Sequence, residues 1–153
     1  MKRSADVKKL NRNDVSDFKS LVEIFADVFE NDQPISDDEH LSTLLANPDF
    51  LAFVVKQDQK VIGGLTLYVL HGYYGTRPAA YIYDVGITPE FQGQGLGKLL
   101  MAEVREYCKD NGFAEVYVEA ESDDSDAVNF YRKTEYSNET NVVQFTYSFD
   151  DEK

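Results

Sequence analysis

The sequence predicts a mixed α/β fold built as one domain over residues 1–153. Short segments rich in Val, Leu, Phe and Tyr, typical of strands, alternate along the chain with segments whose apolar residues recur every three or four positions, typical of helices. The 153 residues are 42% hydrophobic and include ten Phe and ten Tyr, which is enough for one core. No internal repeat, low-complexity tract or linker divides the chain. A single layered α/β domain follows from these observations.

The first half of the chain predicts a strand, two helices and a hairpin. Asn13-Asp14 is the predicted cap before the apolar stripe of the first helix, and Ser36 forms a capping box with Glu39 at the start of the second. Gly63-Gly64 interrupts the second hairpin strand and predicts a bulge or a close approach of another backbone segment. The predicted elements are a strand over residues 7–10, a helix over residues 15–28, a helix that stops before Pro48, and strands over residues 50–56 and 61–70.

The second half of the chain predicts three strands and two helices. Residues 79–87 form the longest strand candidate, and a helix over residues 97–111 ends at Gly112, a residue typical of helix C-termini. The remaining predicted elements are a strand over residues 113–120, a short helix over residues 124–133 and an alternating final strand over residues 142–149.

The charge of the protein excludes some partners and favours others. The chain has 28 acidic and 15 basic residues, a formal net charge of -13, which repels nucleic acids and anionic membrane surfaces. Polycationic small molecules are attracted by the same charge, although an acidic surface could also serve solubility alone. No apolar run approaches the ~20 residues that span a bilayer, so the sequence predicts a soluble, cytoplasmic protein.

Cysteine and histidine residues do not indicate a metal site or a disulfide. Cys108 is the single cysteine, and because no base stands beside it we interpret it as a structural thiol rather than a catalytic one. His40 and His71 are far apart in the sequence and have no ligand-spaced partners. The sequence therefore predicts no metal.

A glycine-rich turn, Gln92-Gly93-Gln94-Gly95-Leu96-Gly97-Lys98, lies between the longest strand and the following helix. Small residues at such a turn let backbone N–H groups approach an anion, and the helix N-terminus adds about half a positive charge. The turn lacks the spacing and the terminal Lys-Ser/Thr of a Walker loop, and its glycines do not match a dinucleotide fingerprint. A pyrophosphate site is the favoured interpretation, and a purely structural turn is the alternative.

This turn resembles the signature of the GNAT superfamily of acetyl-CoA-dependent N-acetyltransferases, Gln/Arg-x-x-Gly-x-Gly/Ala after a long strand, in which Gln92, Gly95 and Gly97 fall in register. The resemblance implies a central, mostly antiparallel twisted sheet that splays between its fourth and fifth strands and is flanked by about four helices. It also implies acetyl-CoA as co-substrate, with the pyrophosphate on the turn and the pantetheine arm beside the preceding strand. The implied cofactor-binding residues are Val85, Gly86, Ile87, Gln92, Gly93, Gln94, Gly95, Leu96, Gly97, Lys98 and Asn129.

A second segment, residues 127–133, resembles the Ala-x-x-x-Tyr-x-Lys helix of the same superfamily. The resemblance implies that Tyr131 protonates the departing thiolate of coenzyme A. A phenol and a thiol have pKa values of roughly 10 and 8.5, so a positioned tyrosine can deliver this proton. Taken alone, Tyr131 would be interpreted as a core residue. The family usually continues with Gly-Phe, which Glu135-Tyr136 replaces here.

Residues 29–131, above all Tyr81-Ile82-Tyr83-Asp84-Val85, resemble the aminoglycoside 3-N-acetyltransferases of the GNAT type. The resemblance implies a cationic small-molecule amine as acceptor, most specifically the 3-amino group of an aminoglycoside antibiotic. Carboxylates can hold such an amine, each pair contributing about 1 kcal/mol in water and more in a shielded cleft. Asp123 and Asp124 could equally be helix caps. The predicted substrate-binding residues are Glu30, Asp32, Tyr83, Asp84, Glu119, Glu121, Asp123 and Asp124.

The predicted reaction is direct attack of the amine on acetyl-CoA in a ternary complex. Because carboxylates stabilise the ammonium form, a base must remove a proton, and Asp84 is the first candidate and Glu121 the second. The Val85–Ile87 amides are the predicted oxyanion donors. Alternative acceptors are a polyamine, another small amine or a protein N-terminus, and the alternative of another class is a non-catalytic acetyl-CoA sensor. A homodimer is compatible with the sequence.

Overall fold

The structure is a computed structural model that describes residues 5–149 of the chain. These residues belong to two compact units, Met1–Glu119 and Ala120–Lys153. The first unit contains the sheet and three of the α-helices, and the second contains the fourth α-helix. The predicted mixed α/β class is confirmed.

The first unit is organised around one five-stranded sheet whose strands follow the chain order. The first four strands are antiparallel to their neighbours, and the fifth lies parallel to the fourth. The sheet is therefore mostly antiparallel, as predicted. Its strands are β1 (Asp6–Lys9), β2 (Phe50–Gln57), β3 (Lys60–Leu70), β4 (Ala79–Ile87) and β5 (Glu115–Val118).

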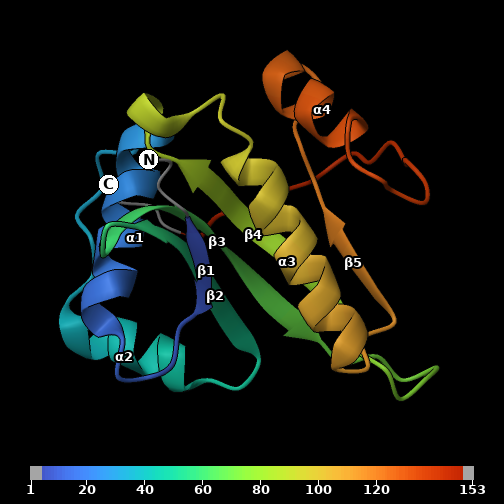
Figure 1. The fold of residues 1–153 in the computed structure, drawn as a ribbon. Coiled ribbons are helices and arrows are strands. Elements are labelled where there is room, and N and C mark those ends of the chain that lie inside the picture. The colour runs from blue at the N-terminus through green and yellow to red at the C-terminus, as the bar shows by residue number, and fades with distance from the viewer. Residues whose placement is uncertain (1–4, 150–153) are drawn as a thin grey trace. The chain divides into compact units, whose positions relative to one another are not determined.

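Helices cover both faces of this sheet, because the side chains of neighbouring strand residues point to opposite faces. The helices α1 (Val15–Val28) and α2 (Asp38–Ala46) lie on one face, and α3 (Leu96–Asp110) lies on the other (Figure 1). On β2, Phe53 packs its ring against Tyr107 of α3, whereas the adjacent Val54 belongs to the core beneath α1.

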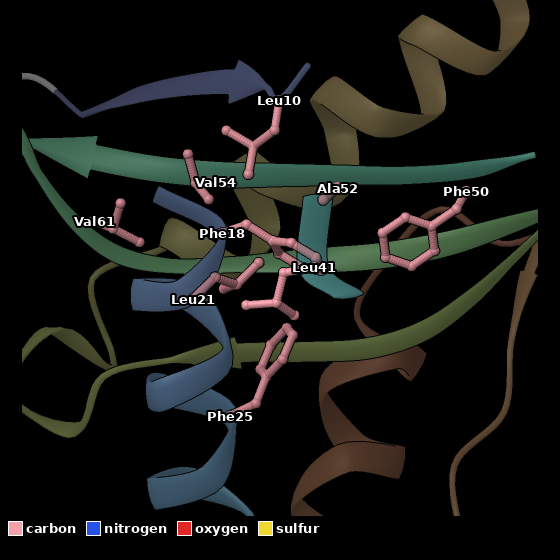
Figure 2. Packing of buried hydrophobic residues seen from close by; sticks show 9 residues of the cluster. All are labelled: Leu10, Phe18, Leu21, Phe25, Leu41, Phe50, Ala52, Val54 and Val61. Atoms are coloured by element: carbon pink, nitrogen blue, oxygen red, sulfur yellow. The ribbon is translucent and has the colours of Figure 1, made fainter. Parts of the chain in front are cut away.

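The core between the sheet and α1 combines one stripe of helix residues with residues of the neighbouring elements (Figure 2). Phe18, Leu21 and Phe25 occupy one stripe of α1 and are almost completely buried. Burial of each such side chain stabilises the fold by roughly 1.5–3 kcal/mol. The other members of this cluster are Leu10, Leu41, Phe50, Ala52, Val54 and Val61.

The Gly63-Gly64 pair permits a close approach of backbone and helix to β3, as the sequence predicts. A Cβ atom on Gly64 would lie 2.2 Å from the carbonyl oxygen of Phe53 and 2.8 Å from Leu21 of α1. A Cβ on Gly63 would lie 2.6 Å from the carbonyl oxygen of Gly86. Larger residues at either position would force α1 or β4 away from the sheet.

The helix ends follow most of the predicted signals. Asp14 is at the N-cap of α1, but its side chain forms no capping hydrogen bond. The N-cap of α2 is Asp37 and not Ser36, because the Asp37 carboxylate accepts a hydrogen bond from the backbone N–H of His40 at 2.9 Å. α3 ends at Asp110, and Gly112 follows with φ of +79°, a left-handed conformation that favours glycine.

The second unit holds α4 (Ser125–Arg132), whose N-cap is Asp124. The predicted strand over residues 142–149 is wrong, since residues 135–149 form neither helix nor strand. The alternating pattern is present, but Val143, Phe145 and Phe149 are exposed, Phe149 by 91%. An alternating segment becomes a strand only where a partner strand supplies hydrogen bonds, and no strand pairs with it among the described residues.

Candidate active site

The glycine-rich turn is connected to the end of β4 by a short segment that hydrogen bonds hold in place. The backbone N–H of Thr88, directly after β4, donates to the carbonyl of Ile62 on β3 at 2.8 Å, and a short 3₁₀ helix, η1 (Pro89–Phe91), follows. The side-chain amide of Gln92 donates to the carbonyl of Ile87, also at 2.8 Å. The Gln92 side chain therefore holds the turn in place, while its backbone remains part of the predicted anion site.

The backbone of the turn is open in the way an anion requires. Gly93 and Gly95 have φ of +80° and +81°, and no atom lies within 4 Å of a Cβ built on either. Gly95 is the N-cap of α3 and has no side chain to satisfy the first N–H groups of the helix, and the first turn carries no acidic residue. The helix dipole and these N–H groups fit a pyrophosphate, and Lys98 adds a positive charge in the same turn.

The strand β4 has a free edge immediately before this turn. Its pairing with β5 covers Ala79 to Ile82 and stops at the pair Ile82–Val118, while β4 continues to Ile87. The predicted splay between the fourth and fifth strands is thus confirmed. Val85, Gly86 and Ile87 pair with β3 on one side only, so backbone groups on their other edge are available to an extended ligand.

A β-bulge at Tyr83 decides which side chains share a face of β4. Leu67 of β3 pairs with Ile82, and the next residue, Thr66, pairs with Asp84, so Tyr83 has no partner on β3. The extra residue places Tyr83 and Asp84 on the same face of the sheet, the face on which α1 and α2 lie. Burial raises the pKa of Asp84 above its usual range, so this carboxylate accepts a proton more readily than a solvated aspartate does.

Four tyrosines on this face form a continuous row, which we call the tyrosine shelf: Tyr68, Tyr81, Tyr83 and Tyr117. Tyr81 and Tyr117 are directly opposite on β4 and β5 and stack with ring centroids 5.0 Å apart. Tyr83 meets Tyr81 and Tyr68 edge-on, with centroids 6.2 and 5.6 Å apart. At the end of the shelf the Tyr81 hydroxyl donates a hydrogen bond to the Glu119 carboxylate at 3.1 Å.

Sequence reasoning selected Tyr83 from the shelf and missed the other three. The spacing of two between Tyr81 and Tyr83, and between Tyr117 and Glu119, was a signal that these side chains share a face. The parallel register that joins β4 to β5 is not encoded in either segment alone.

The other predicted acceptor acids of the first unit lie after α1. Glu30 and Asp32 are exposed in the loop that follows this helix, and Glu30 adopts φ of +52°. The last turns of α1 lie over β4, because a Cβ on Gly86 would be 3.1 Å from Phe25 and 3.9 Å from Val28. Glu30 and Asp32 therefore come directly after the end of α1, which packs on Gly86. Gly86 is two residues after Asp84 and on the same face of the sheet.

The remaining predicted site residues belong to the second unit. Burial, with a smaller contribution from the Asp124 carboxylate, raises the pKa of Tyr131 to about 12, so its phenol remains protonated at neutral pH. Asp124 caps α4 by accepting a hydrogen bond from the Ala127 backbone N–H at 3.2 Å. Glu121, Asp123 and Asn129 are exposed.

Cys108 is not placed for covalent chemistry. Its side chain is buried on the inner face of α3, and burial raises the pKa of the thiol to about 11. The reactive thiolate is thus scarce at neutral pH. The structural interpretation of this cysteine agrees with its position.

The family model for the acetyltransferase (GNAT) family matches residues 18–136, which is most of the chain and includes the turn and α4. The chain belongs to the GNAT acetyltransferase family. Members of this family use acetyl-CoA, and the open turn at the start of α3 suits the pyrophosphate of that molecule. The predicted fold is confirmed with it.

Among solved structures, the chain is similar to an aminoglycoside acetyltransferase from an uncultured soil metagenomic sample, determined in complex with sisomicin. The two are 39% identical with a TM-score of 0.93, covering 95% of this chain and 96% of the other. An aminoglycoside N-acetyltransferase in complex with coenzyme A, 14% identical, has a TM-score of 0.78 over 96% and 97% of the two chains. That second likeness concerns the fold alone.

Among curated proteins, the mycothiol acetyltransferase of Arthrobacter sp. (strain FB24) is 40% identical over 65 residues, 42% of this chain. The match covers 20% of that protein, and the match to the mycothiol acetyltransferase of Rhodococcus jostii (strain RHA1) covers 27%. The chain thus spans about a fifth to a quarter of these curated relatives.

Two further observations concern membranes and metals. None of the helices within residues 5–149 combines the length and apolarity that crossing a bilayer requires. In the same range, no three His, Cys, Asp or Glu side chains gather in a way that would hold a metal ion. His71 instead contacts Asp49, with 2.9 Å between Nε2 and Oδ1.

Proposed function

We propose that this chain transfers the acetyl group of acetyl-CoA to an amine of a cationic small molecule, the 3-amino group of an aminoglycoside. The observation that carries the proposal is the open glycine turn at the N-terminus of α3, next to the unpaired edge of β4. Together these features offer backbone N–H groups to a pyrophosphate and a strand edge to an extended arm. The acetyl thioester supplies the activated acyl group.

In this proposal the turn and the strand edge hold the co-substrate through backbone groups. Residues 92–98 bind the pyrophosphate, and Val85, Gly86 and Ile87 bind the pantetheine arm, with backbone amides of the same segment facing the carbonyl oxygen on which negative charge develops. No side chain of this segment forms a bond to the acetyl group. The amine attacks the thioester carbon directly, a carbon–nitrogen bond forms, and the carbon–sulfur bond breaks.

Asp84 is the proposed proton acceptor. The acceptor amine is an ammonium ion at neutral pH and must lose a proton before its lone pair can attack. Asp84 lies on β4 between Tyr83 and Val85, and its raised pKa improves its capacity to take that proton, directly or through water. Glu121 is the second candidate for this function.

Tyr131 is the proposed acid that protonates the sulfur of coenzyme A as the carbon–sulfur bond breaks. This proposal is supported by the family match, which includes residue 131, and by the pKa of about 12 that keeps the phenol protonated. Asn129 is proposed to contact the cofactor from the same helix. We further propose that residues 1–153 act as one catalytic domain, since the family match extends over parts of both units.

The aminoglycoside acceptor is supported by the likeness to the sisomicin complex over 95% of this chain. It is also supported by the net charge of -13, by Asp84 on β4 and by Glu119 directly after β5. The other proposed acceptor-binding acids are Glu30, Asp32, Glu121, Asp123 and Asp124. An enzyme with this activity in the cytoplasm would confer aminoglycoside resistance on its host.

The test measures coenzyme A thiol release from acetyl-CoA with a panel of aminoglycosides, and locates the acetyl group by mass spectrometry and NMR. We expect turnover with sisomicin and acetylation of its 3-amino group. Acetylation at another nitrogen would refute the regiochemistry, and turnover with spermine or a peptide N-terminus alone would refute the acceptor. Binding of acetyl-CoA without thiol release from any amine would indicate a sensor instead.

A further inference from the structure

The tyrosine shelf has no function in the chemistry proposed above. Tyr68 packs against the core beneath α1, but the other three shelf tyrosines are not among the residues that pack there. Tyr83, on β4, is 59% exposed, and Tyr117, on the last strand of the sheet, β5, is 37% exposed. The corresponding residues of β2 and β3 on this face are covered by α1 and α2. Large aromatic rings left in contact with solvent on one face are typical of a surface that binds something.

The shelf also fixes a carboxylate. The Tyr81 hydroxyl donates to Oε1 of Glu119 at 3.1 Å, while the Tyr81 ring is itself fixed by stacking on Tyr117 with an interplanar angle of 19°. Burial, together with the Glu119 carboxylate, raises the pKa of Tyr81, so the phenol stays a donor. One oxygen of Glu119 is thereby oriented, and the other lone pairs of this exposed side chain remain available to a ligand.

A flat aromatic surface next to an oriented carboxylate has a definite ligand preference. The C–H face of a saturated ring packs on tyrosine rings, and an ammonium group on that ring can reach both the carboxylate and the aromatic faces. A linear polyamine offers the charge without the ring face. Asp84, the proposed proton acceptor, lies on the same face, three residues after Tyr81.

We propose that the tyrosine shelf and Glu119 form a second subsite of the acceptor site, which binds a cationic ring and so selects ring-bearing polyamines such as amino sugars over linear ones. The inference rests on the proposed function, since it takes the acceptor to be a cationic amine. Tyr81 is a positioning residue in it, because it orients Glu119. Tyr117 contributes the ring surface.

The experiment measures calorimetric binding of sisomicin and of spermine to the full-length protein and its variants, without acetyl-CoA, and then steady-state turnover. We expect Tyr117→Leu to weaken sisomicin binding about fivefold, through loss of the stacked surface, and to leave spermine binding unchanged. Tyr81→Phe keeps the ring and should weaken sisomicin binding about threefold, by releasing Glu119. Tyr74→Leu is the matched control, because Tyr74 is 97% exposed in a loop outside the shelf.

A double-mutant cycle separates positioning from general damage. Glu119→Ala should weaken sisomicin binding by about as much as Tyr81→Phe or more. Tyr81→Phe should have no further effect in the Glu119→Ala background, because no side-chain acceptor for the Tyr81 hydroxyl remains at position 119. Melting temperatures and the KM for acetyl-CoA should match the wild type in each single variant. Additive effects in the cycle would show that Tyr81 does not act through Glu119 and would overturn its positioning function.

The outcomes also distinguish this inference from the proposed function. Sisomicin binding that depends on the shelf, without any thiol release, would support the subsite and refute the acetyl transfer. Acetylation of sisomicin, with equal sisomicin binding by the wild type, Tyr117→Leu and Tyr81→Phe, would support the acetyl transfer and refute the subsite. Equal binding of spermine and sisomicin by the wild type, or no binding of sisomicin, would overturn the subsite.

Discussion

The glycine turn follows β4 and the tyrosine shelf lies partly on β4, and we propose that the two bind ligands in opposite ways. The turn that follows β4 offers backbone N–H groups, so its residues must be small and two of them adopt positive φ. The shelf on the face of β4 offers side chains, and its rings meet at centroid distances of 6.2 and 5.0 Å. Recognition by backbone leaves a glycine pattern in the sequence, whereas recognition by side chains depends on strand register.

The comparison predicts that changes in the two regions will affect different substrates. A change in the turn should raise the KM for acetyl-CoA, and a change on the shelf should raise the KM for the amine. Asp84 and Tyr131 stand outside this division, since both are proposed to move protons, and their substitution should lower kcat.

Asp84→Asn should have the largest effect. We expect kcat to fall about 1,000-fold, within the range usual for loss of a general base, with the KM for acetyl-CoA unchanged. Steady-state kinetics at saturating substrate would check this, with Asp110→Asn, an exposed aspartate at the end of α3, as control. A kcat within threefold of the wild type would exclude Asp84 as the base.

The same variant should be more stable than the wild type at neutral pH. Burial raises the pKa of Asp84 in the folded protein, so the folded state binds this proton more tightly than the unfolded state does. The charged carboxylate therefore costs stability above the folded pKa, and this cost disappears as the pH falls below the unfolded value. In denaturant unfolding, the free energy of unfolding should be larger for Asp84→Asn than for the wild type at pH 7, and the two values should become equal in acid. A less stable variant at pH 7 would contradict the claim that burial raises the pKa of Asp84.

Tyr131→Phe should lower kcat about 100-fold and leave acetyl-CoA affinity nearly intact, because the ring remains and only the proton donor is lost. In the wild type, kcat should not decline between pH 8 and 10 on account of this phenol, since its pKa is about 12. Tyr136→Phe, which alters an exposed tyrosine nearby in the sequence, is the control. An unchanged kcat in Tyr131→Phe would remove Tyr131 from the mechanism.

Gly95→Ala should raise the KM for acetyl-CoA about tenfold, because a residue with a Cβ is strained at φ of +81° by roughly 1–2 kcal/mol. The KM for the amine should stay the same. Gly75→Ala is the matched control, since Gly75 has equally open surroundings without a positive φ. Wild-type kinetics in Gly95→Ala would mean that the turn does not need its conformation for binding.

Cys108 should give the smallest effect on activity. With a pKa of about 11 and a buried side chain, the thiol should react with a disulfide reagent in the native protein far more slowly than in the unfolded protein. Cys108→Ala should retain kcat within about twofold. Rapid labelling of Cys108 in the native protein, with simultaneous loss of activity, would contradict the interpretation that this thiol takes no part in catalysis.

Local signals were sufficient for much of the fold. The turn, the helix α3 and the glycine that ends it are read from neighbouring residues, and the Gly63-Gly64 pair correctly predicted a close approach. Ser36 was chosen as a cap where Asp37 serves, because both residue types suit an N-cap and only the dihedral angles decide between them.

The features that were missed depend on partners distant in the sequence. Tyr81 and Glu119 are 38 positions apart and meet because β4 and β5 are parallel in one particular register. The bulge at Tyr83, which brings Asp84 onto the shelf face, is likewise a property of the β3–β4 pair. The predicted strand over residues 142–149 was wrong because its alternating pattern is local, whereas a strand also needs a partner, and none of the described strands pairs with this segment.

The most direct test of this account measures both KM values, for acetyl-CoA and for sisomicin, in Gly95→Ala, in Tyr117→Leu and in the double variant. The account predicts that the turn variant raises only the KM for acetyl-CoA, that the shelf variant raises only the KM for sisomicin, and that the double variant shows both increases independently. An increase of both KM values in either single variant, with unchanged melting temperature, would contradict the division of β4 into a backbone site and a side-chain site.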